Sequence, residues 1–462
     1  MIDRKALLND LKQQVKAVET DLAEQAKALP EVGTRLRAEY DQARKLGRTA
    51  TTWNTWLYGD GKKYEGRITQ VAAAWVLGTV FVRFCEDNGL IPEPYLTAPA
   101  AERRDLAQAR YEAYVENDPD PTYRGWLERA FAELGEGQAG RLLFDRRHNP
   151  LFQVPLSHDG ARRLVEFWRE RNVAGMLIHD FTDPLDDYGT RGWDTRFLGD
   201  LYQDMSETAR EVYKLLQTPV FVEEFILDRT MDPAVREFGF EKLKMIDPTC
   251  GSGHFVLGAF RRLVRLWAER RPDADMHERV RAALDSVHGV DVNPFAVAIA
   301  RFRLLIAAMA AAGMQTMAEA AKYDWPIHLA VGDSLIKERQ LELTLGEESP
   351  RDPLAEFAYS VEDVHEHLSI LEPDRYHVVV GNPPYNQVKD KKLNELYREL
   401  YSACVGTYAL SVPFVQRFFG LAKQGDADGR GYGLVGQITA NSFMKREFGT
   451  RLIEEFLAHK VS

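Results

Sequence analysis

The feature that most constrains the fold of this chain is a set of five short apolar runs in its second half. The runs are LKMID (residues 243–247), VHGVDV (287–292), IHLAVG (327–332), HVVVG (377–381) and GYGLVGQI (431–438). Segments with helical spacing lie between them. Strands that alternate with helices form a parallel sheet covered by helices on both faces. We therefore expect an α/β fold whose ligand lies in the crevice at the carboxyl ends of the strands.

The helix between the second and third runs has recognisable ends. Asn293 is a favoured N-cap residue, Pro294 suits the first helical position, and Gly313 is suited to end the helix. These signals predict a helix that crosses from one parallel strand to the next.

Residues 1 to about 190 have the apolar spacing of three and four that is typical of helices. A long helix is expected over residues 66–88. One apolar stripe near the N-terminus consists of Leu7, Leu8, Leu11, Val15 and Val18.

Two segments rich in Pro, Asp and Gly, 117–121 and 180–192, predict loops. At 462 residues the chain is too long for one ordinary core, so at least two domains are expected. We place the boundary in the second loop, which gives a mostly α-helical N-terminal domain at 1–192 and an α/β domain at 193–462. The acidic segment at about 337–375 lacks periodicity and is interpreted as an insertion.

Composition indicates a cytoplasmic globular protein. The three cysteines are far apart and lack the spacing of metal ligands, which fits a reducing compartment, and no metal site is predicted. The polar start is not a signal peptide. Two apolar stretches, 71–82 and 295–313, are interpreted as buried helices because the first is short and the second carries arginines.

A net charge of −11 argues against a nucleic-acid partner, although it does not exclude a local basic face.

The segment DPTCGSG (residues 247–253) follows the first apolar run and leads into a helix. Gly251 and Gly253 would let a ligand approach the backbone, and the helix start offers N–H groups without helical partners. Asp247 is suited to a cationic or hydroxyl-bearing group. An ordinary strand–turn–helix explains the same residues equally well. A phosphate-binding loop is disfavoured because no Gly-Lys-Ser/Thr follows.

Acidic residues end the next two runs as well. Asp291 can accept hydrogen bonds from both hydroxyls of a ribose, which selects an unphosphorylated nucleoside. Asp333, in VGDSL, could face the amino group of an adenine. A single Asp at such a position is more often a helix cap, but three acids at successive strand ends favour a site.

The fourth run ends in Asn382, Pro383, Pro384 and Tyr385. The amide oxygen of Asn382 and the carbonyl of Pro383 can both accept hydrogen bonds from one planar NH2 group. Such a nitrogen becomes positive as it attacks a methyl group, so acceptors placed there stabilise the transition state. The prolines fix this geometry beforehand, and Tyr385 offers a face on which a base can stack. A Pro-Pro turn capped by Asn is the structural alternative.

The order of TP (residues 218–219), DPTCGSG, GVDVNP, GDSL and NPPY resembles the gamma-group amino-methyltransferases of DNA, which use S-adenosyl-L-methionine. The resemblance covers roughly residue 193 to the end. It implies a Rossmann-like S-adenosylmethionine-dependent methyltransferase domain, and double-stranded DNA with a flipped adenine as substrate. By this resemblance the catalytic residues are Asn382, Pro383, Pro384 and Tyr385. The implied cofactor-binding residues are Thr218, Pro219, Asp247, Pro248, Thr249, Cys250, Gly251, Gly253, Asp291, Val292, Asp333, Ser334 and Asn382.

The stretch around 193–230, the DPTCGSGHFVLGAF segment and the large helical N-terminal region are similar to the adenine methyltransferases of BREX phage-defence systems, particularly type 2. That likeness implies host-DNA modification alongside other phage-defence proteins. The family pattern continues beyond HKVS with further strands and a target-recognition domain. We therefore expect this chain to be an N-terminal portion of such an enzyme.

Three alternatives stay open. N5-glutamine and ribosomal RNA methyltransferases also carry NPPY, although they usually lack a large helical N-terminal region. Methylation of cytosine at N4 is disfavoured, because the enzymes that carry it out more often have Ser in place of Asn382. A nuclease pattern at Asp374 and DKK (residues 390–392) is interpreted as coincidence, because it surrounds NPPY. The fold could also serve as a DNA- or partner-binding scaffold without activity.

Overall fold

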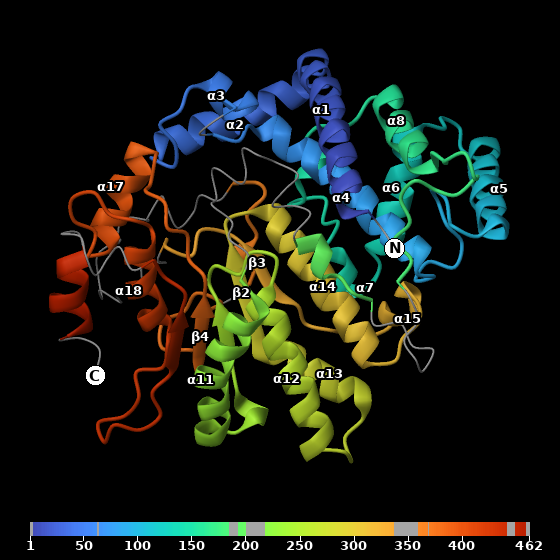
Figure 1. Cartoon of the computed structure of the whole chain (residues 1–462). Coiled ribbons are helices and arrows are strands. Elements are labelled where there is room, and N and C mark those ends of the chain that lie inside the picture. The colour runs from blue at the N-terminus through green and yellow to red at the C-terminus, as the bar shows by residue number, and fades with distance from the viewer. Residues whose placement is uncertain are drawn as a thin grey trace, which may run out of the picture.

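The computed structural model describes residues 3–61, 64–183, 193–199, 218–336, 359–367, 369–440 and 449–458. Figure 1 shows the N-terminal helices arching over the region that holds the strands. The helices before the sheet are α1 (Arg4–Ala28), α2 (Pro30–Lys45), α3 (Trp53–Tyr58), α4 (Arg67–Asp87), α5 (Ala101–Asn117), α6 (Tyr123–Leu134), α7 (Gly137–Arg141), the short 3-10 helix η1 (Pro150–Gln153) and α8 (His158–Arg169).

The second half alternates strands and helices, as the apolar runs predict. Its helices are α11 (Val220–Phe238), η2 (Phe240–Lys242), α12 (His254–Arg270), α13 (Met276–Ser286), α14 (Pro294–Ala311), α15 (Met317–Ala320), η3 (Val364–Glu366), α17 (Lys391–Leu400), α18 (Ser411–Leu421) and the π-helix η6 (Arg451–Leu457). All five predicted strands are confirmed in shorter form: β1 (Met245–Asp247), β2 (Val287–Asp291), β3 (His328–Val331), β4 (Val378–Gly381) and β5 (Leu434–Gln437).

These strands form one parallel sheet in the order β3-β2-β1-β4-β5. The chain runs outward from β1 to β3 and then returns to the other side of β1 to form β4. The change of direction lies between β1 and β4, which is where an open parallel sheet leaves a crevice at its carboxyl edge. The segments DPTCGSG and NPPY leave these two adjacent strands at that edge.

The predicted boundaries of the crossover helix α14 are confirmed. The Asn293 side chain accepts hydrogen bonds from the N–H groups of Phe295 and Ala296, at 3.0 and 3.2 Å. Pro294 occupies the first position of the helix, and Gly313 follows its end with a φ of 68°. These contacts fix where the helix begins and therefore how the end of β2 faces the crevice.

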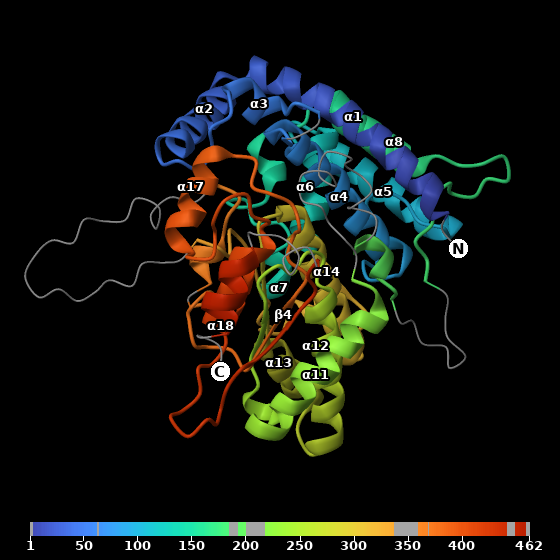
Figure 2. The same cartoon turned by 60° about the vertical axis from the view of Figure 1, so that its left-hand side comes forward.

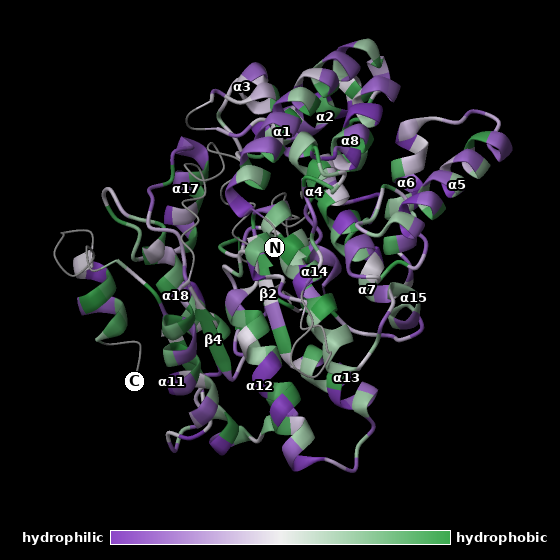
Figure 3. Cartoon of the chain, turned by 45° about the vertical axis from the view of Figure 1, so that its right-hand side comes forward, coloured by the Kyte–Doolittle hydropathy of each residue, from purple (hydrophilic) through white to green (hydrophobic). Residues whose placement is uncertain are grey.

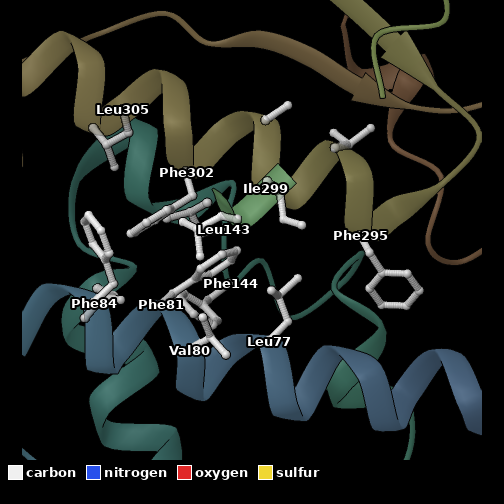
Figure 4. Close-up of a cluster of buried hydrophobic side chains, with 14 of the residues drawn as sticks. Leu77, Val80, Phe81, Phe84, Leu143, Phe144, Phe295, Ile299, Phe302 and Leu305 are labelled. Carbon is white, nitrogen blue, oxygen red and sulfur yellow. The ribbon is translucent and has the colours of Figure 1, made fainter. Parts of the chain in front are cut away.

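Helix α4 lies against α14, so the N-terminal helices share a core with the sheet. Figure 4 shows their apolar side chains pointing toward one another. The rings of Phe81 and Phe302 stack with centroids 4.4 Å apart. Both helices are long and apolar enough to cross a membrane, but 89% and 78% of their apolar windows are buried inside the chain. The prediction of two buried helices is confirmed.

Outer helices are amphipathic, as the predicted apolar stripes require. In Figure 3 purple and green alternate along α5, whereas β4 is strongly green. In α1, Leu7, Leu11, Val15 and Val18 are buried, and Leu8 packs against the same core. One cluster of buried apolar residues extends from α1 to β4.

Part of the proposed boundary loop, 184–192, lies outside the described residues, so the division at residue 192 stays a prediction.

The insertion expected at about 337–375 is described only from residue 359 onward, except residue 368. Its described part contacts the sheet directly. The N–H of Asp363 donates to the carbonyl of Val331 at 3.0 Å, and the Asp363 carboxylate pairs with Arg301 of α14 at 2.5 Å. The segment that returns toward β4 is thus anchored beside the carboxyl end of β3.

Candidate functional site

A cavity with about 1050 Å³ of space, open to solvent, lies at the carboxyl edge of the sheet. We call it the sheet-edge cavity. It brings together the segments that follow β1, β2, β3 and β4. Its lining residues are Thr218, Asp247, Pro248, Thr249, Cys250, Gly251, Ser252, His254, Phe255, Asp291, Val292, Gly332, Asp333, Ser334, Leu335, Asn382, Pro383, Pro384, Tyr385, Asn386, Tyr397, Leu410 and Phe414.

The glycine turn after β1 is held by the acid that ends β2. Gly251 and Gly253 have φ values of 51° and 85°, a region that glycine adopts without strain. The Gly251 N–H donates to Asp291 Oδ2 at 2.9 Å, and the Asn293 N–H donates to Asp291 Oδ1 at 2.9 Å. Burial raises the pKa of the Asp291 carboxyl. Asp291 therefore orders the turn while lining the cavity.

Gly253 has a packing role, since it does not line the cavity. A Cβ atom at this position would lie 3.0 Å from the Cβ of Ala300 on α14. The glycine therefore lets the start of α12 approach α14 closely. Pro219 precedes α11 as its N-cap residue and is likewise absent from the lining, whereas its predicted neighbour Thr218 is present.

Asp247 is the most enclosed acid of the site, with 2% of its surface exposed. Its Oδ1 atom accepts hydrogen bonds from the N–H and the hydroxyl of Thr249, at 3.0 and 3.1 Å. Burial raises the pKa of Asp247 to about 8, because removal from water disfavours the charged carboxylate. A cationic ligand in the cavity would favour the ionised form.

Gly381 lets β4 end directly beside this acid. A Cβ atom there would lie 2.6 Å from Thr249 Oγ1 and 2.7 Å from Asp247 Oδ1. Such distances are too short for non-bonded atoms, so only glycine fits without displacing its neighbours. This contact joins the end of β4, and hence Asn382, to the acidic end of β1.

The NPPY segment forms the wall of the cavity that follows β4. The Tyr385 hydroxyl donates to Asn382 Oδ1 at 2.5 Å. Burial raises the pKa of this hydroxyl, so it stays protonated and can remain a donor. Pro383 is buried, and the Leu410 N–H donates to the Asn386 carbonyl at 2.8 Å. The amide of Asn382 is therefore oriented before any ligand arrives.

The residues after β3 are held by two helices that follow NPPY. The Tyr397 hydroxyl of α17 donates to Asp333 Oδ2 at 2.6 Å, and the Leu335 N–H donates to Asp333 Oδ1 at 3.0 Å. The Ser334 hydroxyl donates to the Pro248 carbonyl at 2.7 Å, and Arg417 of α18 donates to the Ser334 carbonyl at 2.7 Å. Asp333 retains further acceptor positions for a ligand, since a carboxylate has about four.

Several lining residues were not predicted as site residues from the sequence: Ser252, His254, Phe255, Gly332, Leu335, Asn386, Tyr397, Leu410 and Phe414. His254 begins α12 and also lines the cavity. Burial lowers its pKa to about 3, so the imidazole is neutral at physiological pH. The residues of α17 and α18 carry no signal beyond helical spacing.

The nuclease-like residues have structural partners. Asp390 caps α17 by accepting hydrogen bonds from the N–H groups of Lys392 and Leu393, and Asp374 accepts one from the N–H of Gln424.

Within the described ranges, one group of side chains lies close enough together to hold a metal ion: His148, His365 and Glu366. Glu366 there accepts hydrogen bonds from Arg147 and His148, which accounts for the cluster without a metal.

Comparison with known proteins gives both a family match and a relative similar to the whole chain. Residues 285–461 match the model of the Eco57I restriction-modification methylase family. The chain is 74% identical over its full length to "Adenine-specific methyltransferase PglX" of Streptomyces coelicolor, of which it covers 38%. It is 35% identical over 293 residues to a putative type II restriction enzyme and methyltransferase of Methanocaldococcus jannaschii, with 49% of this chain and 24% of that protein covered.

The chain thus spans less than two fifths of the length of either relative. Among solved structures, the ATP-dependent Type ISP restriction-modification enzyme LlaBIII bound to DNA is similar over 96% of this chain and 25% of that one. The TM-score is 0.46 and the identity 14%, a likeness too loose to carry an argument.

Proposed function

We propose that this chain, which contains an Eco57I restriction-modification methylase domain and is similar to PglX throughout, carries the cofactor and methyl-transfer site of an adenine-specific DNA N6-methyltransferase. One observation carries the proposal: the glycine turn, the strand-end acids and the NPPY segment line the same cavity. The parallel sheet is the core of a Rossmann-like methyltransferase domain, and the helices α1 to α8 belong to an N-terminal helical domain that arches over the sheet.

The cavity suits S-adenosyl-L-methionine, which when bound supplies a methyl group on a positively charged sulfur. Three acids line the cavity, Asp247, Asp291 and Asp333. An acidic cavity favours a ligand with cationic groups, and such a ligand offsets the cost of ionising the buried Asp247 and Asp291 carboxyls, whose pKa values burial raises. Thr218 and the glycine turn would hold the amino-acid end of the cofactor.

The nucleoside end would lie over β2 and β3. Asp291 ends β2, where an acid can accept hydrogen bonds from ribose hydroxyls. Val292 is half-exposed beside it and offers apolar contact to a flat ring. Asp333 and Ser334 line the same part of the cavity, with Asp333 as an acceptor for an adenine amino group.

Asn382 and Pro383 would bind the amino group of the target adenine. Their oxygens accept hydrogen bonds from the N6 hydrogens, and these bonds strengthen as the nitrogen becomes positive during attack on the methyl carbon. The hydrogen bond from Tyr385 keeps Asn382 Oδ1 in place, which reduces reorganisation. S-adenosyl-L-methionine would supply the methyl group to this nitrogen, which Asn382 and Pro383 would hold, and the proton of the methylated nitrogen could leave to water. No general base is required.

The substrate proposed is double-stranded DNA with the target adenine extruded from the helix, because a base inside the duplex cannot reach an enclosed site. The physiological role proposed is host-DNA modification in a BREX-like phage-defence system with other defence proteins. That role rests on the similarity to PglX. A cytoplasmic location follows from this substrate.

The second candidate is an NPPY-type N5-glutamine or RNA methyltransferase. The same amide and carbonyl acceptors suit any planar NH2 group, which keeps this alternative open. A DNA duplex and a release-factor-like protein, offered together with labelled cofactor, separate the two: label on DNA supports the proposal and label on protein supports the alternative. Cofactor binding without transfer to either would indicate a binding scaffold.

The direct test is Asn382→Ala, compared with the surface variant Asn54→Ala on α3. We expect Asn382→Ala to bind S-adenosylmethionine as the parent does while methyl transfer to DNA falls by about 100-fold or more, because a transition-state hydrogen-bond acceptor is lost. Asn54→Ala should change neither quantity. Near-normal transfer by Asn382→Ala would remove this residue from the mechanism.

A further inference from the structure

A second cavity adjoins the sheet-edge cavity and has no role in the mechanism above. It contains about 1340 Å³ of space open to solvent. We call it the outer cavity, and it lies between the segments Arg48–Gln70 and Asn386–Leu393. The two cavities share five lining residues, Val292, Asp333, Asn386, Tyr397 and Leu410. A ligand in the outer cavity would therefore lie next to one at NPPY.

The wall from the N-terminal helices is built of alternating guanidinium groups and aromatic rings. The Arg67 guanidinium lies 4.9 Å from the ring centre of Trp56 and 5.3 Å from that of Tyr359. Arg48 lies 5.1 Å from the ring centre of Tyr359. The buried guanidinium groups hold the partly buried rings of Trp56 and Tyr359 in place at the outer cavity.

This wall is fixed to the catalytic side of the molecule. Arg48 pairs with Glu362 at 2.7 Å, and both side chains are at most 7% exposed. The Ala50 N–H donates to Asp390 Oδ2 at 2.6 Å, which ties the loop after α2 to the start of α17. Figures 1 and 2 both show α2 and α3 beside α17. These two contacts join distant segments of the chain beside the outer cavity.

Tyr64 lies between α3 and α4, lines the outer cavity and is partly buried. The loop is closed by close backbone contact: a Cβ atom on Gly59, whose φ is 76°, would lie 2.8 Å from the Tyr64 carbonyl oxygen. Burial and the nearby Asp390 both raise the pKa of the Tyr64 hydroxyl. Tyr64 and Asp390 thus line the same cavity from distant segments of the chain.

The charge of the outer cavity indicates what kind of group it takes. Three basic and four acidic side chains line it, which does not favour a row of phosphates. The amides of Gln70, Asn386 and Gln387 offer donors and acceptors to the edge of a base. Flat faces with mixed hydrogen-bonding groups suit a nucleobase better than a phosphate.

We propose that the outer cavity holds an unpaired nucleotide of the DNA strand next to the extruded adenine, with its base stacked on Tyr64. This inference rests on the proposed function, because it takes NPPY as the site of the target adenine. Extruding one base removes the stacking partner of its neighbours. A surface that stacks the neighbouring base would keep the strand open while the adenine is bound.

The test measures how the purified chain, saturated with the cofactor analogue sinefungin, binds a short single-stranded oligodeoxynucleotide labelled with fluorescein. Fluorescence anisotropy gives the affinity. We expect Tyr64→Ala to weaken binding about 5- to 100-fold, the range for loss of one stacked base. Tyr64→Phe should bind as the parent does, because the ring is kept. The matched control is Tyr58→Ala, which removes an exposed tyrosine of α3 that does not line the cavity.

Equal affinity of Tyr64→Ala and the parent would overturn the proposal, as would equal weakening by Tyr58→Ala. Tighter binding of a peptide or of RNA than of the DNA oligonucleotide would also contradict it. Failure of the proposed function gives a different result, because sinefungin would then not bind in calorimetry. The oligonucleotide affinities of the parent and the variants would still be compared, without sinefungin.

Discussion

Replacing Gly381 by alanine tests the contact that joins the two halves of the site. The added Cβ would lie 2.6 Å from Thr249 Oγ1, 2.7 Å from Asp247 Oδ1 and 2.8 Å from a ring carbon of Phe418. Asp247 and Phe418 are buried and Thr249 is partly buried, so the added atom would have to displace at least one of them. Overpacking of this kind typically costs about 1–3 kcal/mol.

We expect Gly381→Ala to lower the melting temperature by several degrees, because about 1 kcal/mol corresponds to roughly 2–4 °C in a domain of 150–250 residues. Displacement of Asp247 and Thr249 should also weaken S-adenosylmethionine binding in calorimetry. The control is Gly420→Ala on α18, where an added Cβ meets nothing within 4 Å. That variant should be neutral or stabilised by up to about 1 kcal/mol. Equal melting temperatures and cofactor affinities for Gly381→Ala and the parent would refute the steric argument.

Three further predictions follow from the buried polar groups. Tyr397→Phe removes the hydrogen bond to Asp333 and should weaken S-adenosylmethionine binding roughly tenfold in calorimetry, a loss of about 1.5 kcal/mol; unchanged affinity would show that this bond does not position the acid. Because the pKa of Asp247 is raised, the folded state keeps a proton between about pH 4 and pH 8 that the unfolded state loses. The contribution of this residue to the free energy of unfolding should therefore fall as the pH rises from about 4 to about 8, by at most about 1.4 kcal/mol per pH unit. Urea midpoints of the parent and Asp247→Asn should therefore diverge with pH, and parallel curves would contradict this. Glu362→Ala removes the buried carboxylate that pairs with Arg48 and should cost about 3 kcal/mol or more in urea unfolding; a loss below about 1 kcal/mol would be incompatible with the enclosed pair.

The strands and the crossover helix were predictable because their signals are local. Runs such as HVVVG need no distant partner to indicate a buried strand, and Asn293 with Pro294 marks a helix start wherever it occurs. Parallel strands bring their carboxyl ends to one edge, so DPTCGSG and NPPY were expected at the same edge. That their strands are neighbours comes from the strand order in the structure. The structure confirms these five strands and the helix ends.

Other parts of the site depend on side chains that approach from distant elements. Asp333 was expected to face a ligand, but nothing in VGDSL indicates that Tyr397, 64 residues later, would bond to it. Gly253 belongs to the predicted glycine pair, yet its packing against Ala300 appears only when α12 and α14 are placed. The role of each predicted site residue toward a cofactor remains a prediction.

The N-terminal helices are the part for which sequence reasoning was least specific. Apolar spacing indicated helices but not their partner, and the stacking of Phe81 on Phe302 arises from two segments more than 200 residues apart. Arg48 and Ala50 reach the neighbourhood of NPPY through Glu362 and Asp390. No local pattern encodes such contacts, because each needs the complete fold.

Ultraviolet crosslinking with S-adenosylmethionine labelled in its methyl group tests the central claim most directly. The purified chain is irradiated with the labelled cofactor, with and without excess sinefungin, and the labelled peptide is sequenced. We predict label on residues 382–385 or 247–252, which line one cavity and which sinefungin should protect. Label confined to peptides outside the sheet-edge cavity, or label that sinefungin does not reduce, would contradict the claim that cofactor and target amino group meet at this edge of the sheet.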